Sequence, residues 1–562
     1  MRRLLLCALA ATVAGALAVP VGAGAQTTST QQATMQSATG EYVVLYKSTA
    51  AAKTAKAAIE AAGGTVVREN TAIGMATVRS SRADFISAVS GKAGVAGAAR
   101  NRAIGEVPRL SRKADDVESE GRGEVKAKVT KDAAAVHGAE PLADKQWGMR
   151  MVNATPSGSY RVNQGSHQVL VGIMDTGIDT SHPDLTPNFN RKLSRNFTTD
   201  IPLIDGPCEA EPDHSCNDPA DVDEQGHGTH VAGIVGAAIN GLGVSGVAPR
   251  VSLVNIRAGQ DSGFFFLDAT VNAMVYAAQV GIDVVNMSFF TDPWLFNCAA
   301  NPADSPQEQI EQRTIIAATQ LAVNFARKHG VTLVAAYGNE HIDLGKPTVD
   351  TTSPDFPPGT AKTRTVDNSC LDMPTEADGV ISTVALGPSG RKADYSTYGI
   401  EGTDVSAPGG YFRDFFGSPQ FRQPENEVLS TAPKSVLEAA GRIDPNGVPI
   451  DPLVVRDCKG DVCAYYQYLQ GTSMASPHAA GVAALVVAAH GHRDKDGGLT
   501  LNPDATERIL EATAEDTPCP TPPLQTYTSE GRDASFNALC EGTIERNGFY
   551  GFGVVDALAA VL

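Results

Sequence analysis

The chain has 562 residues, of which 42% are hydrophobic and 19% are charged, and its formal net charge is −18. This composition is typical of a globular protein, and the acidic balance argues against nucleic acid as a partner. Residues 1–140 hold 18 basic and 12 acidic residues, a net of +6, whereas residues 141–562 hold 27 and 51, a net of −24. The asymmetry suggests two units with complementary fields, or simply two solvated surfaces.

Residues 1–25 begin with two arginines, continue with an apolar stretch and end in Ala23-Gly24-Ala25. This pattern predicts a secretory signal peptide that is cut before Gln26. A membrane anchor is less favoured because small residues and Pro20 interrupt the apolar run before it reaches spanning length. We therefore expect a secreted, extracellular protein with no membrane attachment after the signal is removed.

Residues 41–107 read as a small α/β unit. We expect two strands and two helices there, over residues 41–46, 50–63, 75–80 and 82–91. Residues 108–141 are charged and poor in apolar side chains, which is typical of an exposed linker that is easily cut.

From residue 142 onward, short apolar runs alternate with longer amphipathic ones. This alternation predicts a parallel sheet covered by helices on both faces, with the active site at the carboxyl ends of its strands. The expected strands cover residues 168–175, 251–258, 282–288, 331–339, 379–386 and 404–409, and the expected helices cover 228–239, 267–281 and 318–330.

Eight cysteines remain once the signal is removed, and an even number in an exported chain points to disulfides. The spacing suggests Cys208–Cys216 and Cys458–Cys463 as local pairs, which leaves Cys298–Cys370 and Cys519–Cys540. The connectivity stays open, because eight cysteines allow 105 pairings. Neither a Cys-x-x-Cys pair nor a His-Glu-x-x-His motif is present, so the sequence does not indicate a zinc site.

Three polar residues are candidates for chemistry: Asp175 at the end of an apolar strand, His227 between glycines, and Ser473 before an apolar run. Each alone has a structural explanation, as a turn cap, a loop histidine or a helix N-cap. Together they fit nucleophilic catalysis, in which the histidine takes the serine proton and the carboxylate orients the imidazole. Asn339, at another strand end, is a candidate donor to an oxyanion, or else a turn residue.

The segments "VGIMDTGIDTSHPDL", "GHGTHVAGIVG", "VVNMS" and "GTSMASPHAAGVAAL" resemble the subtilisin (subtilase) family of serine proteases, in the family's Asp…His…Ser order. The resemblance covers essentially all of residues 142–562. It implies an α/β, subtilisin-like three-layer fold with a parallel sheet, preceded by a small α+β propeptide domain at residues 26–107. It also implies a maturation cleavage within the linker, residues 108–141.

By position, the resemblance implies that Asp175 orients the base, His227 is the general base and acid, Ser473 is the nucleophile and Asn339 donates to the oxyanion. The implied activity is a serine endopeptidase that acts on protein or peptide substrates through an acyl-enzyme. It would be made as a self-processed proenzyme, inhibited by its own propeptide, and we expect a monomer. The alternatives are a catalytically silent binding module and a peptide ligase that uses the same acyl-enzyme.

The resemblance also implies that substrate binds as an added strand between residues 262–264 and 288–290. The residues concerned are Ser262, Gly263, Ser288, Phe289 and Phe290. The family usually has Leu-Gly where this chain has Phe289-Phe290. The sequence leaves open whether these rings make the cleft aromatic or fold into the core.

The spacing between the motifs is long, and the extra residues lie in Pro- or Cys-containing stretches that we expect to be loops rimming the cleft. These stretches fall before His227, at residues 292–313, and at residues 411–466.

Asp184 matches a calcium ligand of the family, and Asn240 is a possible second ligand. Calcium needs six to eight oxygens, and the loop at residues 238–246 looks one residue short. The sequence leaves a structural calcium open, as it does an ion in the acidic loop at 205–223. No cofactor is required for the chemistry.

Overall fold

The computed structural model describes residues 39–101, 103–106, 117–121, 139–210, 214–291, 293–354, 360–494 and 497–562. The predicted signal peptide lies outside these residues, as does most of the predicted linker.

The centre of the molecule is a seven-stranded sheet in which every pair of neighbours is parallel. Apart from the two-residue edge strand Arg195–Asn196, its strands are largely apolar runs buried on both faces, which is the pattern that parallel sheets require. The fold class expected from the alternating runs is confirmed. In spatial order the strands are β16 (Val405–Pro408), β15 (Val380–Leu386), β12 (Thr332–Ala336), β10 (Val284–Met287), β6 (Leu170–Met174), β8 (Ser252–Arg257) and β7 (Arg195–Asn196).

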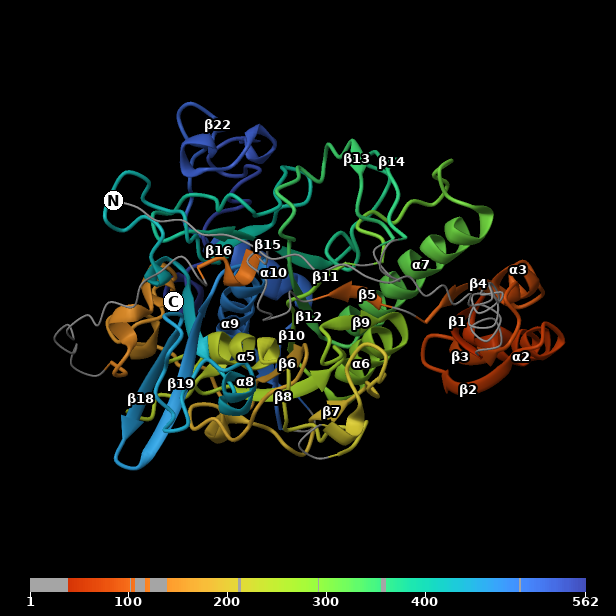
Figure 1. Cartoon of the computed structure of the whole chain (residues 1–562), viewed down its shortest axis with the longest axis horizontal. Helices are drawn as coiled ribbons and strands as arrows, with labels where there is room; N and C mark the ends of the chain where they lie inside the picture. Colours follow the sequence, from red (N-terminus) through yellow and green to blue (C-terminus); the bar gives the residue numbers. More distant parts are fainter. Residues whose placement is uncertain are drawn as a thin grey trace, which may run out of the picture.

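Alternate residues of each central strand enter two different hydrophobic cores. Val284 and Val334 face the core that contains α5 (His227–Gly236) and α9 (Thr472–His490). Their neighbours Val285 and Leu333 face the core that contains α6 (Leu267–Val280) and α7 (Pro306–Lys328). The side-chain period of two along a strand therefore produces three layers, with the sheet in the middle (Figure 1). Shorter helices are α4 (Trp147–Met151), α8 (Lys434–Ala439) and α10 (Pro503–Ala512).

Helix α9 is apolar on all sides and lies within the core that it shares with α5. It is the one described helix with the length and hydropathy of a membrane span, and 89% of its most apolar window is buried inside the protein. Its composition is therefore explained by its central position.

The N-terminal unit is a separate four-stranded antiparallel sheet in the order β2-β3-β1-β4, with its own core and two helices. It packs beside α6 and α7 at one end of the molecule (Figure 1). The strands β2 and β4 were not expected: β2 is largely exposed, and β4 is rich in glycine and alanine. The unit contains β1 (Gly40–Tyr46), α2 (Ala52–Ala61), β2 (Thr65–Asn70), β3 (Met75–Ser80), α3 (Phe85–Val89) and β4 (Val95–Arg100).

The contact between the two units combines apolar packing with polar pairs. Val43 and Met75 of the N-terminal sheet lie in the same hydrophobic core as α6 and α7. The carboxylate of Asp268, on α6, accepts a hydrogen bond of 2.6 Å from Thr77 and forms an ion pair with Arg68. Arg100 lies 3.7 Å from the carboxylate of Glu311 on α7. A basic side and an acidic side therefore meet at this boundary, in the sense that the charge asymmetry suggested.

Two stretches expected to be loops contain regular structure. Helix α7 begins at Pro306, because Ser305 and Glu308 form a capping box at its N-terminus. The stretch at 411–466 contributes most of an antiparallel sheet, made of β17 (Val428–Thr431), β19 (Val462–Leu469) and β18 (Val454–Lys459). Smaller pairs are β13 (Val349–Asp350) with β14 (Arg364–Thr365), β20 (His492–Arg493) with β21 (Leu499–Thr500), and β22 (Leu524–Gln525) with β23 (Ala538–Leu539).

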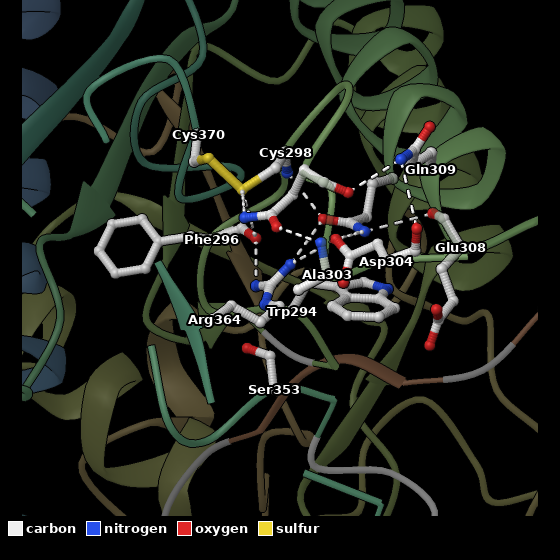
Figure 2. Close-up of polar contacts among 12 residues, drawn as sticks. Trp294, Phe296, Cys298, Ala303, Asp304, Glu308, Gln309, Ser353, Arg364 and Cys370 are labelled. Atoms are coloured by element: carbon white, nitrogen blue, oxygen red, sulfur yellow. Dashed lines mark hydrogen bonds and ion pairs between the residues drawn. A yellow bond between two sulfur atoms is a disulfide. The ribbon is translucent and has the colours of Figure 1, made fainter. Parts of the chain in front are cut away.

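The stretch before α7 is fixed by one buried arginine (Figure 2). Arg364 donates to the carboxylates of Asp304 at 2.9 Å and Asp350 at 2.5 Å, and to the carbonyl oxygen of Phe296 at 2.7 Å. Its guanidinium lies 4.7 Å from the centre of the Trp294 ring. Paired charges of this kind are costly to bury but impose one geometry on the segments they join.

Four disulfides are formed, and they are the pairs that the spacing suggested: Cys208–Cys216, Cys298–Cys370, Cys458–Cys463 and Cys519–Cys540. The Cys298–Cys370 bond closes 72 residues and ties the stretch before α7 to the chain after β14, whereas Cys458–Cys463 closes five within a hairpin.

Replacing Cys298 and Cys370 by alanine should therefore lower the free energy of unfolding by about 4 kcal/mol, against about 2 kcal/mol for Cys458 and Cys463, since a longer closed loop restricts the unfolded chain more. Urea unfolding of both double variants in a Ser473→Ala background measures the difference. Equal losses, or the reverse order, would contradict the chain-entropy account.

Candidate active site

Three residues far apart in the sequence lie at the carboxyl end of the central sheet. Asp175 follows β6, His227 is the first residue of α5, and Ser473 lies in the first turn of α9. All three are at most 1% exposed. His227 Nδ1 lies 2.8 Å from Asp175 Oδ1, which fixes the imidazole with its Nε2 on the other side. The predicted orienter and base are therefore in hydrogen-bond contact.

Glycines around His227 permit this close packing. Gly226 has φ 102°, in the left-handed region that favours glycine. A Cβ on Gly228 would lie 2.2 Å from the carbonyl oxygen of Gly177, so no larger residue fits there. The histidine is thereby placed where the turn after β6 and the start of α5 touch.

The hydroxyl of Ser473 makes no hydrogen bond within the described part of the chain. The main chain of Ser473 is fixed, because its carbonyl oxygen accepts a hydrogen bond of 2.8 Å from Ser288 Oγ. Its place in the first turn puts it near unpaired N–H groups and the positive end of the α9 dipole. The hydroxyl is therefore available for reaction.

Asn339 lies just beyond β12, and its amide has one end fixed. The side-chain oxygen accepts hydrogen bonds of 3.0 Å from both the backbone nitrogen and the hydroxyl of Thr472, next to Ser473. The buried Nδ2 has no hydrogen-bond partner among the described residues. A buried amide donor without a partner is unusual and calls for a functional explanation.

A second carboxylate, which sequence reasoning missed, faces the other nitrogen of His227. Glu118 Oε1 lies 3.4 Å from His227 Nε2, and both side chains are fully buried. A Cβ on Gly471 would lie 3.0 Å from the same oxygen. The sequence predicted an exposed linker here, and that prediction is wrong for Val117–Gly121, which crosses the site. The acidic run around Glu118 gave no sign that it would be buried.

The charge balance around His227 favours the imidazolium. Burial acts to lower the pKa of His227, but the carboxylates of Asp175 and Glu118 outweigh it and raise this pKa well above its ordinary value. The contacts with Asp175 and Glu118 therefore favour the protonated form of the base while Glu118 is in place. A protonated base cannot accept the proton of Ser473.

The two segments expected to hold substrate lie on either side of another strand. β9 (Phe264–Phe266) follows Ser262 and Gly263, and β11 (Phe290–Thr291) follows Ser288 and Phe289. Between them runs β5 (Ala103–Glu106), antiparallel to both (Figure 1). The chain's own segment thus fills the place predicted for a substrate strand.

The aromatic residues do not all line this place. Phe289 is fully buried and stacks on Phe265 with ring centres 4.1 Å apart, so its ring belongs to the core. Ser288 also points inward, with its hydroxyl bonded below Ser473. Of the two alternatives that the sequence left open, Phe289 follows the one in which the ring folds into the core. The side chain of Phe290 lies outside the described residues.

Asp184 does not have the surroundings of a calcium ligand. Its carboxylate accepts hydrogen bonds from the Tyr466 hydroxyl at 2.8 Å, the Asn240 amide nitrogen at 3.0 Å and the Val244 backbone nitrogen at 3.3 Å. Calcium requires six or more oxygen ligands, and these neighbours are hydrogen-bond donors. Burial raises the pKa of Asp184 to about 7. The residues at this position do not fit the ion.

Three other aspartates, Asp200, Asp218 and Asp261, have carboxylate oxygens within 4.8 Å of one another. The guanidinium of Arg257 pairs with all three, 2.8 Å from Asp261 and 2.5 Å from Asp218. Burial and the neighbouring carboxylates raise the pKa of Asp200 to about 8. Arg257 thus already supplies positive charge to these three aspartates, one of which, Asp218, lies in the acidic loop.

Comparison with known proteins places these features in a family. The model of the subtilase family matches residues 166–553. Subtilisin DY of Bacillus licheniformis is 29% identical over 319 residues, 57% of this chain and 76% of that protein. The nisin leader peptide-processing serine protease NisP of Lactococcus lactis is 27% identical over 382 residues, 68% of this chain but 48% of that protein.

Solved structures agree on the fold. The epidermin leader peptide processing serine protease of Staphylococcus aureus superposes with a TM-score of 0.61, at 22% identity, over 93% of this chain and 98% of that one. Fervidolysin from Fervidobacterium pennivorans gives 0.52, at 20% identity, over 93% and 61%. At these identities the likeness shows a shared fold.

Replacing Glu118 by glutamine in the Ser473→Ala protein should lower the pKa of His227, because one of the two negative charges that stabilise the imidazolium is removed. The matched control is Glu60→Gln, which removes an exposed carboxylate on α2 that does not contact His227. NMR titration of the labelled imidazole measures both. An unchanged pKa in the Glu118→Gln protein would show that the contact has no electrostatic effect.

Proposed function

Because the chain belongs to the subtilase family of serine endopeptidases, we propose that it is a secreted endopeptidase that hydrolyses peptide bonds through an acyl-enzyme. Asp175, His227 and Ser473 are the proposed triad, and Asn339 is the proposed oxyanion donor. The observation that carries the proposal is the 2.8 Å contact between Asp175 and His227. It lies at the same end of the sheet as Ser473 and Asn339.

The proposed reaction follows from these positions. His227 Nε2 takes the proton of Ser473 Oγ as that oxygen attacks the peptide carbonyl carbon, and Asp175 stabilises the imidazolium. The oxyanion accepts hydrogen bonds from Asn339 Nδ2 and the backbone N–H of Ser473. His227 then gives its proton to the leaving amine. Water attacks the acyl-enzyme by the reverse sequence and releases the acid, and subtilases need no cofactor for these steps.

We propose further that the chain folds as an inactive precursor. Two contacts support this: β5 fills the place of a substrate strand, and Glu118 faces the nitrogen of His227 that must receive the serine proton. Residues 26–107 would act as the propeptide, and self-cleavage within 108–141, on the C-terminal side of residue 121, would release both contacts. The predicted signal and the four disulfides fit an oxidising, extracellular destination.

The Asn339→Ala protein should turn over casein about 10²- to 10³-fold more slowly, because the oxyanion loses one of its donors. Asn324→Ala, a change at an exposed position on α7, is the matched control and should keep normal turnover. Thermal unfolding of both proteins separates this effect from loss of fold. Normal turnover by folded Asn339→Ala protein would remove Asn339 from the mechanism.

The Ser473→Ala protein should remain uncut between its N-terminal unit and the rest of the chain, since cleavage requires the nucleophile. Mass spectrometry of the secreted product measures this. When an added protease removes the N-terminal unit, the variant should still not hydrolyse casein, whereas the normal mature protein should. If neither mature protein hydrolyses casein, the result would favour a catalytically silent binding module.

A further inference from the structure

The segment that crosses the active site also places a carboxylate in a basic pocket. Glu120 accepts hydrogen bonds at Oε1 from Arg413 Nε, at 2.5 Å, and at Oε2 from an Arg532 terminal nitrogen, at 2.8 Å, and Gln470 Nε2, at 3.1 Å. The side chains of Glu120, Arg413 and Arg532 are 9%, 10% and 18% exposed. Both carboxylate oxygens are thus recognised, largely out of water.

The peptidase domain holds these donors in place independently of the segment. Arg532 is also bonded to the buried carboxylate of Asp394, and its guanidinium lies 4.8 Å from the centre of the Phe536 ring. Arg413 donates to the carbonyl oxygen of Glu530 at 2.7 Å, and the Gln470 side-chain oxygen accepts from the backbone of Phe412 at 2.6 Å. The pocket is preorganised, so an incoming carboxylate meets donors already oriented.

Loss of the segment leaves a charge in need of a partner. Within the described part of the chain, Glu120 is the carboxylate that forms an ion pair with Arg413. A nearly buried guanidinium without its carboxylate is unfavourable, and another carboxylate restores the pairing. This pocket is basic within a unit whose sequence carries a net charge of −24, so it is a local exception on an acidic body.

The pocket also has a defined place along a bound peptide. Gln470, which nearly adjoins Ser473 in sequence, donates its backbone nitrogen to the Glu118 carbonyl oxygen at 3.2 Å and its side-chain nitrogen to that of Val117 at 2.9 Å. Glu118 lies at His227, and Glu120 lies two residues further along. A peptide running in the same direction would therefore present to the pocket a residue beyond the reacting bond, on the side that leaves as the amine.

We propose that Arg413, Arg532 and Gln470 form a subsite for an acidic side chain on the C-terminal side of the bond that is cut. This inference rests on the proposed function and adds a substrate class to it: peptides with Asp or Glu shortly after the cleavage point. Glu120 is then the occupant that the precursor supplies.

The experiment uses the mature protein and pairs of peptides that differ only in Glu or Gln, at the first, second or third position after the cleaved bond. At one of these positions Glu should raise kcat/KM about 10-fold over Gln, because a carboxylate forms ion pairs with the two guanidinium groups and a neutral amide does not. In Arg413→Gln and Arg532→Gln the ratio should fall close to one. Arg250→Gln, at an exposed position remote from the pocket, should keep it.

The outcomes separate the two proposals. Cleavage with equal kcat/KM for Glu and Gln at every position would overturn the subsite and leave the protease intact. If no peptide is cut, the proposed function fails, and binding of the same pairs to mature Ser473→Ala protein still decides the subsite: Glu peptides should bind about 10-fold more tightly, and equal affinity would overturn it. If Arg532→Gln unfolds because Asp394 loses its partner, Arg413→Gln carries the test, with Arg413→Lys expected to restore part of the ratio.

Discussion

The buried hydrogen bond between Asp175 and His227 is the constraint on which the rest of the structure depends. A carboxylate and an imidazole with no solvent exposure are tolerated only if each has a partner. Strand β6 delivers the first and the N-terminus of α5 the second, so the parallel sheet must bring both ends to one edge. The helices on both faces follow from the same sheet, because its strands are apolar on both sides.

The proposed inactive arrangement depends on the electrostatics of the pair itself. A buried imidazolium flanked by a single carboxylate is an attractive site for a second negative charge in a medium of low dielectric constant. Glu118 takes that position and occupies the direction from which a serine proton would arrive. The negative charge of Asp175 makes His227 a strong base, and it also favours the protonated imidazole that Glu118 contacts.

Much of this could be predicted from local pattern. Apolar runs that end in Asp175 and near Asn339 indicated the sheet edge, and glycines marked His227 and Ser473 as points of close approach. The strands β2 and β4 could not be read in this way, since one is exposed and the other is made of small residues that favour no particular structure. The inward position of Phe289 depends on its stacking partner Phe265, a tertiary contact that the residue types at that position do not reveal.

The partners of the segment Val117–Gly121 were also beyond local pattern. Glu118 and Glu120 stand in a charged run that reads as solvated, and the residues that bury them lie more than a hundred positions away: His227 for the first, Arg413 and Arg532 for the second. Only the fold brings opposite charges together over such separations. Composition gave one indication, because residues 1–140 are basic and residues 141–562 are acidic. At Glu118 and Glu120 these charges are reversed, since the N-terminal part supplies the carboxylates there.

The contact between His227 and Glu118 depends on pH. The pKa of His227 is raised in the folded chain, so the stabilisation it gains from Asp175 and Glu118 is fully present below the ordinary histidine pKa. That stabilisation is lost as pH rises through the raised value, where the imidazole gives up its proton and Glu118 faces a neutral ring. The pairing of Glu120 with Arg413 and Arg532 has no such loss, because arginine stays charged throughout. Rising pH therefore weakens the hold on the catalytic base first, while the pocket beyond it still retains the segment.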